Sequence, residues 1–261
     1  MGVGGNDGYG RCGLRGNAPA PSVNPVADVS KVKRVTPAEV PGQPPSDALV
    51  LFDGTQKSLD ANWCDNRGNT SRWKCIDGAA EATRGAGNLC TRRKFGDVQL
   101  HVEWRTPVDP GTNPMNRGNS GVFLLGDLYE VQVFESYETN PADMKFHFYA
   151  DGQAASIYGQ NPPLVNPTRK PGEWQAYDII FHPPVFKDNT CVHPGTLTVF
   201  LNGVLVQDHW NIEGPTWHCR RTYQVKPNSA KESIQLQEHN CPVRFRNVWV
   251  RELPSRHVAR P

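Results

Sequence analysis

The residue types most able to do chemistry in this chain stand in a short alternating stretch, residues 129–134 (YEVQVF). Side chains alternate between the two faces of a β-strand, so Glu130 and Gln132 share one face and the apolar residues share the other. Asn119 and Ser120 precede the neighbouring apolar run, residues 121–124. A carboxyl group that can move a proton, beside amides and a hydroxyl that can bind hydroxyl groups, suits a carbohydrate-facing surface. The alternative is a sheet whose second face is simply hydrated.

The elements that must position these residues are predicted to be β-strands. Alternating or β-rich runs occur at residues 49–52, 73–76, 98–105, 195–201 and 204–206, several of them ending in Asp-Gly or Asn-Gly turns. Two more strands are predicted within residues 233–253, and no segment shows a sustained helical period. This pattern predicts an all-β, two-sheet antiparallel jelly-roll sandwich over residues 46–254, followed by a short tail, residues 255–261.

Bulk composition excludes two classes of partner. The chain has 261 residues, a formal net charge of +2 and 21% charged residues, with no basic stripe, so nucleic acid is not an expected partner. No apolar run approaches the roughly 18–20 residues of a membrane helix, so no membrane span is expected.

The cysteines favour an oxidising compartment. Seven are present and no pair has the CxxC spacing of a metal site. We therefore expect disulfides and an extracellular or periplasmic location, although the residues after Met1 do not resemble a signal peptide. Six cysteines fall in the region predicted to fold: Cys64, Cys75, Cys90, Cys191, Cys219 and Cys241. Cys12 is the odd one, either free or joined to another chain.

Residues 1–45 differ from the rest because they are rich in glycine and proline. Valine recurs there at every third position, at Val23, Val26, Val29, Val32 and Val35. That spacing matches polyproline II and would place all five valines along one edge of an extended N-terminal arm. The arm could be a linker, could dock along its own domain, or could dock into a neighbouring copy and build a filament.

Ten short motifs occur in an order that resembles a known family. They are LFDG at 51–54, Trp73 with DG at 77–78, FGDVQL at 95–100, EWR at 103–105, NSGVF at 119–123, YEVQ at 129–132, SIY at 156–158, GEW at 172–174, LNG at 201–203, and LQEH at 236–239 with VRFRNV at 243–248. Across residues 47–254 the chain resembles the 3-keto-disaccharide hydrolase domain family, which has a concanavalin-like jelly-roll fold.

The resemblance implies a secreted or periplasmic protein that acts on, or binds, sugars, including cleavage of glycosides oxidised at carbon 3. A ketone at carbon 3 acidifies the adjacent C–H bond, so such a site needs a base, an acid and a group that polarises the ketone. Matching motifs place Glu130, Gln132, Gln237, His239 and Arg246 around one sheet face, with Arg105 and Asn119 nearby. The expected roles are Glu130 or His239 as the base and Arg105 or Arg246 at the ketone oxygen. Gln132, Gln237 and Asn119 are expected to bind hydroxyl groups, and Trp174 and Trp217 to stack on sugar.

Each assignment has a structural alternative. His239 could be a polar strand-end residue, and Arg105 and Arg246 could pair across strands with Glu103 or Glu130. Trp104 and Trp249 are expected in the core. No spacing demands a metal or other cofactor, although Glu130, Glu135 and His239 could supply ligands to a divalent ion.

The chain also departs from the family pattern. Glu135 stands where the family usually has aspartate, and Asn240 replaces the usual glycine after the Gln-x-His motif. Three functions therefore stay open: a keto-glycoside-cleaving enzyme, a structural subunit assembled through its arm, and a sugar-binding module without turnover.

Overall fold

The computed structural model describes residues 32–109, 113, 116–137, 149–218 and 224–255. The chain divides into two units, residues 1–34 and residues 35–261, and the second contains all of the named strands. Val23, Val26 and Val29 lie outside the described residues, while Val32 is exposed. Arm docking into a second copy therefore stays a prediction.

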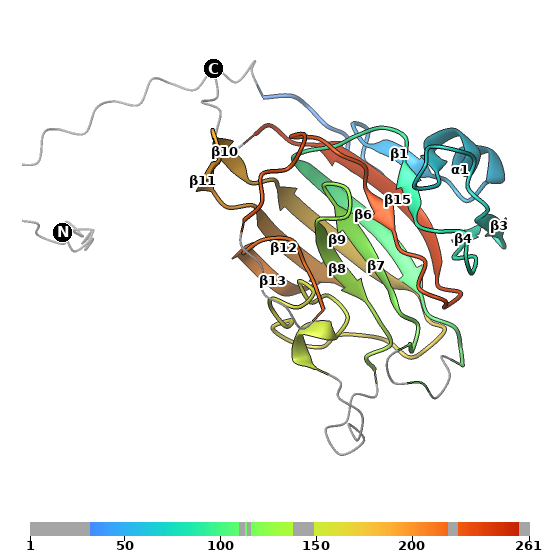
Figure 1. Cartoon of the computed structure of the whole chain (residues 1–261). Coiled ribbons are helices and arrows are strands. Elements are labelled where there is room, and N and C mark those ends of the chain that lie inside the picture. Colours follow the sequence, from blue (N-terminus) through green and yellow to red (C-terminus); the bar gives the residue numbers. More distant parts are fainter. Residues whose placement is uncertain (1–31, 110–112, 114–115, 138–148, 219–223, 256–261) are drawn as a thin grey trace, which may run out of the picture. The chain divides into compact units, whose positions relative to one another are not determined.

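The larger sheet has eight antiparallel strands (Figure 1). In spatial order they are β13 (Val204–Asn211), β12 (Thr196–Leu201), β9 (Gln175–His182), β6 (Val98–Arg105), β15 (Arg244–Glu252), β4 (Ala79–Glu81) and β3 (Lys74–Ile76), with β1 (Leu49–Phe52) also paired to β15. The smaller sheet has five strands in the order β2 (Trp63–Cys64), β5 (Leu89–Thr91), β14 (Gln235–Leu236), β7 (Ser120–Leu124) and β8 (Tyr129–Val133). A separate hairpin joins β10 (Val185–Lys187) to β11 (Thr190–His193).

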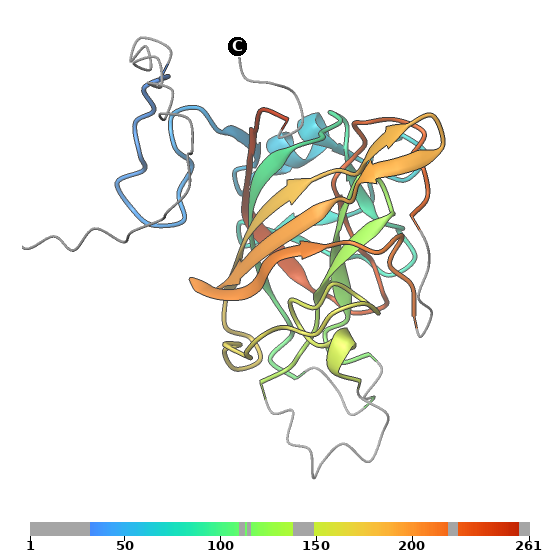
Figure 2. The same cartoon turned by 90° about the vertical axis from the view of Figure 1, so that its left-hand side faces the viewer.

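The two sheets enclose one hydrophobic core, which confirms the predicted jelly-roll sandwich (Figures 1 and 2). Alternate residues of β6, such as Leu100 and Trp104, belong to the core, as do Val131 of β8 and Ile179 of β9. The residues between them therefore point outward, away from the opposite sheet. Each sheet thus has an outer face, and candidate functional residues occupy both of these faces.

One short α-helix, α1 (Gln56–Asn62), was not expected from the sequence. The Thr55 hydroxyl accepts a hydrogen bond from the Ser58 backbone N–H at 3.1 Å, which caps the first turn. Leu59 is the buried residue that attaches the helix to the core. Seven residues are too few to show a sustained helical period. A single 3-10 turn, η2 (Ala150–Gly152), is the other helical element of the described chain.

Part of the predicted arm packs on the outer face of the eight-stranded sheet. The Gly42 carbonyl accepts hydrogen bonds from Asn247 Nδ2 at 2.8 Å and from Trp249 Nε1 at 2.9 Å, and Asp47 pairs with Arg251. Trp249 is consequently buried although its strand position faces outward, and His101 stacks on it at 5.2 Å. Of the two tryptophans expected in the core, Trp104 is a core residue and Trp249 is buried under this segment.

The expected disulfides are not found among the cysteines that the structure describes. Cys64, Cys75, Cys90, Cys191 and Cys241 all carry free thiols. Cys64 and Cys90 are cross-strand partners of β2 and β5, yet the Cys64 thiol donates to the Cys90 carbonyl instead of forming a bond to its sulfur. No helix in the described part of the chain is long and apolar enough to cross a membrane.

Candidate active site

Two parallel rows of side chains cross the outer face of the five-stranded sheet. Strand register places Glu130 opposite Phe123, Phe123 opposite Gln235, and Gln235 opposite Cys90. In the neighbouring row Gln132 lies opposite Gly121, whose carbonyl accepts the backbone N–H of Gln237. The second row therefore carries amide side chains on either side of a glycine.

Glu130 is the one carboxyl group in these two rows, and it is 5% exposed. Its side chain lies against the Cα of Gly121, and a Cβ atom at that position would overlap the carboxyl oxygen. Burial raises the pKa of Glu130 to about 8, because the low-polarity surroundings disfavour the charged form. The carboxyl group therefore holds its proton at neutral pH.

The amides around Glu130 offer hydrogen-bonding groups. Gln132 is buried, and its Oε1 accepts from the Val133 backbone N–H at 3.1 Å, which leaves its amide N–H groups as donors. Gln237 Oε1 is buried without a hydrogen-bond partner among the described residues. Asn119 immediately precedes β7 and is half-buried. A buried acceptor without a donor is unusual in a folded protein and suits a site that receives hydroxyl groups.

A cluster of two tyrosines and a histidine borders Glu130. An isolated bridge joins Val131 to Ile157, a core residue, so Tyr158 lies opposite Glu130 and faces the same way. The Tyr158 hydroxyl lies 2.9 Å from His218 Nδ1, and the Tyr149 hydroxyl lies 2.7 Å from the same nitrogen. The two hydroxyls are 2.7 Å apart.

Two glycines allow this cluster to form. The ring of Tyr149 packs directly over Gly152, where any Cβ atom would overlap it. Gly159 has a positive φ of 69° and admits the backbone carbonyl of Trp217, which precedes His218. The cluster was missed from the sequence because its members lie on irregular segments. The available signal was the SIY motif at residues 156–158, which contains Tyr158.

His239 and Trp217 lie at the margins of this face. His239 is exposed, and its Nδ1 lies 3.3 Å from Asn116 Oδ1. Trp217 is 60% exposed and adjacent to His218, so its indole is available for stacking on a sugar ring.

Three predicted site residues lie elsewhere, which corrects the expectation of a single face. Arg105 of β6 and Arg246 of β15 project from the outer face of the eight-stranded sheet, on the opposite side of the sandwich from Glu130. Both guanidinium groups stand over the Trp174 ring, at 4.8 Å and 4.0 Å from its centroid. The alternative of a structural cross-strand pair is confirmed for Arg246, whose Nε contacts Glu103 Oε2 at 2.6 Å.

The three residues considered as metal ligands are not brought together. Glu135 lies beyond the end of β8 and accepts hydrogen bonds from Thr106 Oγ1 at 3.1 Å and from the Tyr137 backbone N–H at 2.8 Å. Within the described ranges, no three His, Cys, Asp or Glu side chains are grouped so that they could hold a metal ion.

A groove opens farther along the first row, at Gln235 and Cys90, and Glu130 is not among the residues that line it. It has a volume of about 630 Å³ and is lined by Cys90, Gln235, Leu125 and Lys226, among others. That volume lies within the range of small-molecule sites. The outer face of the five-stranded sheet thus carries a protonated carboxyl group beside a phenol–imidazole cluster, and the groove lies at the other end of the same row of residues.

The fold places this chain among the two-sheet jelly rolls, and its candidate site consists of polar side chains on the outer face of the five-stranded sheet. The family model of the 3-keto-alpha-glucoside-1,2-lyase-like domain matches residues 47–251, and the chain belongs to this family. The resemblance stated from the motifs is thereby confirmed.

Solved structures agree on the fold. A proposed glycosyl hydrolase from Parabacteroides distasonis is 40% identical, with a TM-score of 0.76 over 85% of this chain and 92% of that protein. A second proposed glycosyl hydrolase from the same organism is 19% identical, with a TM-score of 0.56 over 80% of this chain and 94% of that one, and shows the fold alone. Among curated proteins, no sequence matches this chain significantly.

Proposed function

We propose that this protein is an enzyme that cleaves glycosides oxidised at carbon 3, by elimination across carbons 1 and 2 of the sugar. Family membership supports the substrate class. The observation that carries the reaction type is the position of Glu130, a buried carboxyl group lying opposite a tyrosine that is hydrogen-bonded to histidine. An elimination requires such a separated acid and base.

Glu130 acts as the acid in this proposal, a change from the role of base expected from its sequence motif. Its pKa of about 8 keeps the carboxyl group protonated at pH 7, so it can donate a proton to the departing anomeric oxygen. A carboxyl group with an ordinary pKa would be ionised at this pH and could not donate.

The tyrosine–histidine cluster acts as the base. His218 Nδ1 can accept the proton of the Tyr158 hydroxyl, which frees the phenol oxygen to remove the proton at carbon 2. The electron pair of that C–H bond forms the double bond between carbons 1 and 2, while the bond from carbon 1 to the glycosidic oxygen breaks. The departing oxygen takes the Glu130 proton, so the products are an unsaturated 3-keto sugar and an alcohol. Addition of water to the unsaturated sugar would complete a net hydrolysis.

The amides of the second row hold the sugar. Gln237 Oε1 is a buried acceptor for a sugar hydroxyl, and an amide N–H of Gln132 or Gln237 takes the place of arginine at the ketone oxygen. Arg105 and Arg246 have no part in this scheme because they project from the other sheet. Trp217 provides the stacking surface at the margin.

Turnover of a chromogenic 3-keto-α-glucoside tests the proposal. Tyr158→Phe and His218→Asn should each lower kcat by about 100-fold or more, the usual size of a general acid–base contribution. Tyr137→Phe and His193→Asn are matched controls, because both side chains lie outside the two rows and the cluster, and they should retain activity. No turnover by the wild-type protein, or equal turnover by Tyr158→Phe, would contradict the proposal.

A sugar-binding module without turnover is the second candidate, and the exposed Trp217 and the polar amide rows favour it. Titration with the same glycoside separates the two functions. Saturable binding without any product release would favour the module, whereas product release that depends on Tyr158 favours the enzyme.

A further inference from the structure

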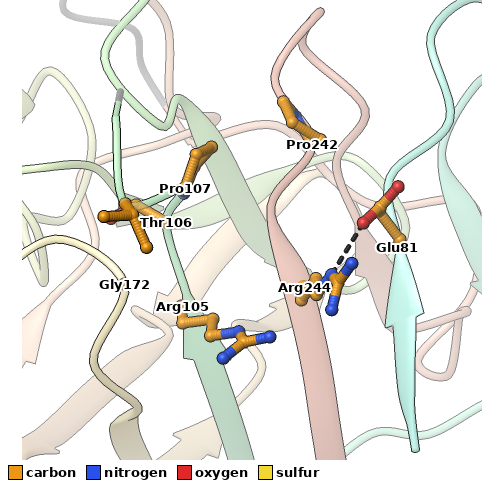
Figure 3. Close-up of a pocket in the computed structure, with 8 residues that line it drawn as sticks. Glu81, Arg105, Thr106, Pro107, Gly172, Pro242 and Arg244 are labelled. Atoms are coloured by element: carbon orange, nitrogen blue, oxygen red, sulfur yellow. Dashed lines mark hydrogen bonds and ion pairs between the residues drawn. The ribbon is translucent and has the colours of Figure 1, made fainter. Parts of the chain in front are cut away.

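The outer face of the eight-stranded sheet carries a second polar site, remote from Glu130. Arg105 of β6 and Arg244 of β15 are direct cross-strand partners. Their head groups lie on the same side of the sheet, with Glu81 beyond Arg244 (Figure 3). Like charges placed directly opposite each other in a sheet are destabilising unless a counter-charge intervenes.

The two arginines differ in how their charge is balanced. Arg244 contacts Glu81 at 2.7 Å and Asp77 at 3.2 Å, so its positive charge is compensated. Arg105 has no acidic partner among the described residues. The only contact described for its guanidinium is the Trp174 ring, at 4.8 Å from the centroid. A ring face attracts a cation but leaves the in-plane N–H donors of the guanidinium free.

A cavity of about 290 Å³ opens at these two arginines. Its other walls are mainly apolar and include Pro107, Val108 and Pro242. Gly172 shapes one wall, because it has a positive φ of 81° and a Cβ atom there would overlap the Val108 side chain. Two guanidinium groups and one carboxylate line the cavity, and Arg105 is the charged group of this lining that has no oppositely charged partner among the described residues.

We propose that this cavity binds the carboxylate of an acidic sugar, at a site separate from the reaction centre. The fork of N–H donors on Arg105 matches the two oxygens of a planar carboxylate. The proline and valine walls suit the C–H face of a sugar ring, and the volume suits one monosaccharide unit. A sugar is the expected ligand because the chain belongs to the 3-keto-alpha-glucoside-1,2-lyase-like domain family.

Isothermal titration with sodium glucuronate tests the proposal, with glucose, sodium acetate and inorganic phosphate as comparison ligands at constant ionic strength. Glucuronate should bind saturably and about tenfold or more tightly than glucose or acetate, because it alone supplies both the charge and the ring. The indole N–H signal of Trp174 should shift in the NMR spectrum of the complex. Absence of binding, or tighter binding of phosphate, would overturn the proposal, and equal binding of acetate would overturn its sugar component.

Variants of Arg105 locate the binding. Arg105→Gln should weaken glucuronate binding by about tenfold or more, and Arg105→Lys should give an intermediate loss because lysine keeps the charge without the fork. Arg67→Gln is the matched control, since it removes one exposed positive charge elsewhere on the surface. Arg105→Gln should leave turnover of a neutral 3-keto-glucoside unchanged. Unweakened glucuronate binding by a folded Arg105→Gln variant would contradict the assignment.

Discussion

The carboxyl group of Glu130 lies against the Cα of Gly121 on the adjacent strand, in space that only a glycine leaves open. This relationship places the carboxyl group against the row that carries Gln132 and Gln237. It also contributes to the burial that keeps Glu130 protonated. A glycine within a strand lowers the intrinsic stability of that strand, so its presence here reflects the close approach of another group.

The first prediction concerns this contact. Gly121→Ala should displace the Glu130 side chain, lower turnover of a 3-keto-glucoside by at least tenfold, and destabilise the fold by about 1–3 kcal/mol through overpacking. Chemical denaturation measures the stability. In a Glu130→Ala background the added methyl group has room, so the same substitution should cost far less. Equal costs in both backgrounds would show that the two residues do not interact.

The second prediction concerns stability and pH. Glu130 has its ordinary pKa of about 4.5 in the unfolded chain and about 8 in the folded protein. Between these values the unfolded chain releases a proton that the folded protein keeps, so this group makes stability fall as pH rises, by up to about 1.4 kcal/mol per pH unit. Glu130→Gln removes this contribution to the pH dependence of stability.

Urea unfolding of both proteins at several pH values from 5 to 8 checks the second prediction. The stability of Glu130→Gln relative to the wild type should increase steadily across that range. Parallel stability curves would mean that the Glu130 carboxyl group is already ionised in the folded protein.

The third prediction concerns the direction of the pH–rate profile. As an acid, Glu130 must be protonated to work, so kcat should decline as pH rises through about 8. If Glu130 were the base, the rate would increase through the same pH range. A stopped assay from pH 6 to 9.5 distinguishes the acid role from the base role. If the Glu130→Gln variant showed the same decline in kcat at alkaline pH, the titrating group would be a residue other than Glu130.

The fourth prediction separates two parts of the N-terminal arm. Removal of residues 1–34 should leave the melting temperature unchanged, because the hydrogen bonds and the ion pair that join the segment to β15 come from Gly42 and Asp47. Removal of residues 1–47 should destabilise the fold by about 2 kcal/mol or more, since Trp249 becomes exposed and two hydrogen bonds to Gly42 are lost. Equal melting temperatures for both truncations would contradict this account.

The truncation that removes residues 1–34 also tests the filament hypothesis. Docking of the valine edge into a neighbouring copy predicts large particles for the full chain and small ones once residues 1–34 are removed. Sedimentation of both proteins measures this directly. Small particles in both samples would contradict the filament hypothesis.

Local alternation was sufficient to predict individual strands. Residues 98–105 were predicted as a strand and form β6 with the same bounds, because apolar and polar residues alternate along this stretch. The same alternation correctly placed Glu130 and Gln132 away from the core. The seven-residue helix α1 was missed because one or two turns do not establish a period.

The grouping of site residues could not be read from alternation, because a period of two gives the face of a strand but not the sheet to which the strand belongs. Arg105 and Glu130 both point outward, yet β6 and β8 lie in different sheets. Which strands pair is decided by contacts between residues far apart in sequence. The disulfide prediction was wrong for the described cysteines for a similar reason, since spacing along the chain does not give the distance between sulfur atoms.

The central claim is that the reaction takes place on the five-stranded sheet. A crystal structure of the Glu130→Gln variant with an uncleaved 3-keto-glucoside tests it most directly. The account predicts that the sugar lies over Gly121, with the anomeric oxygen beside residue 130 and carbon 2 facing the Tyr158 hydroxyl. A sugar bound instead at Arg105 and Trp174, on the eight-stranded sheet, would contradict it.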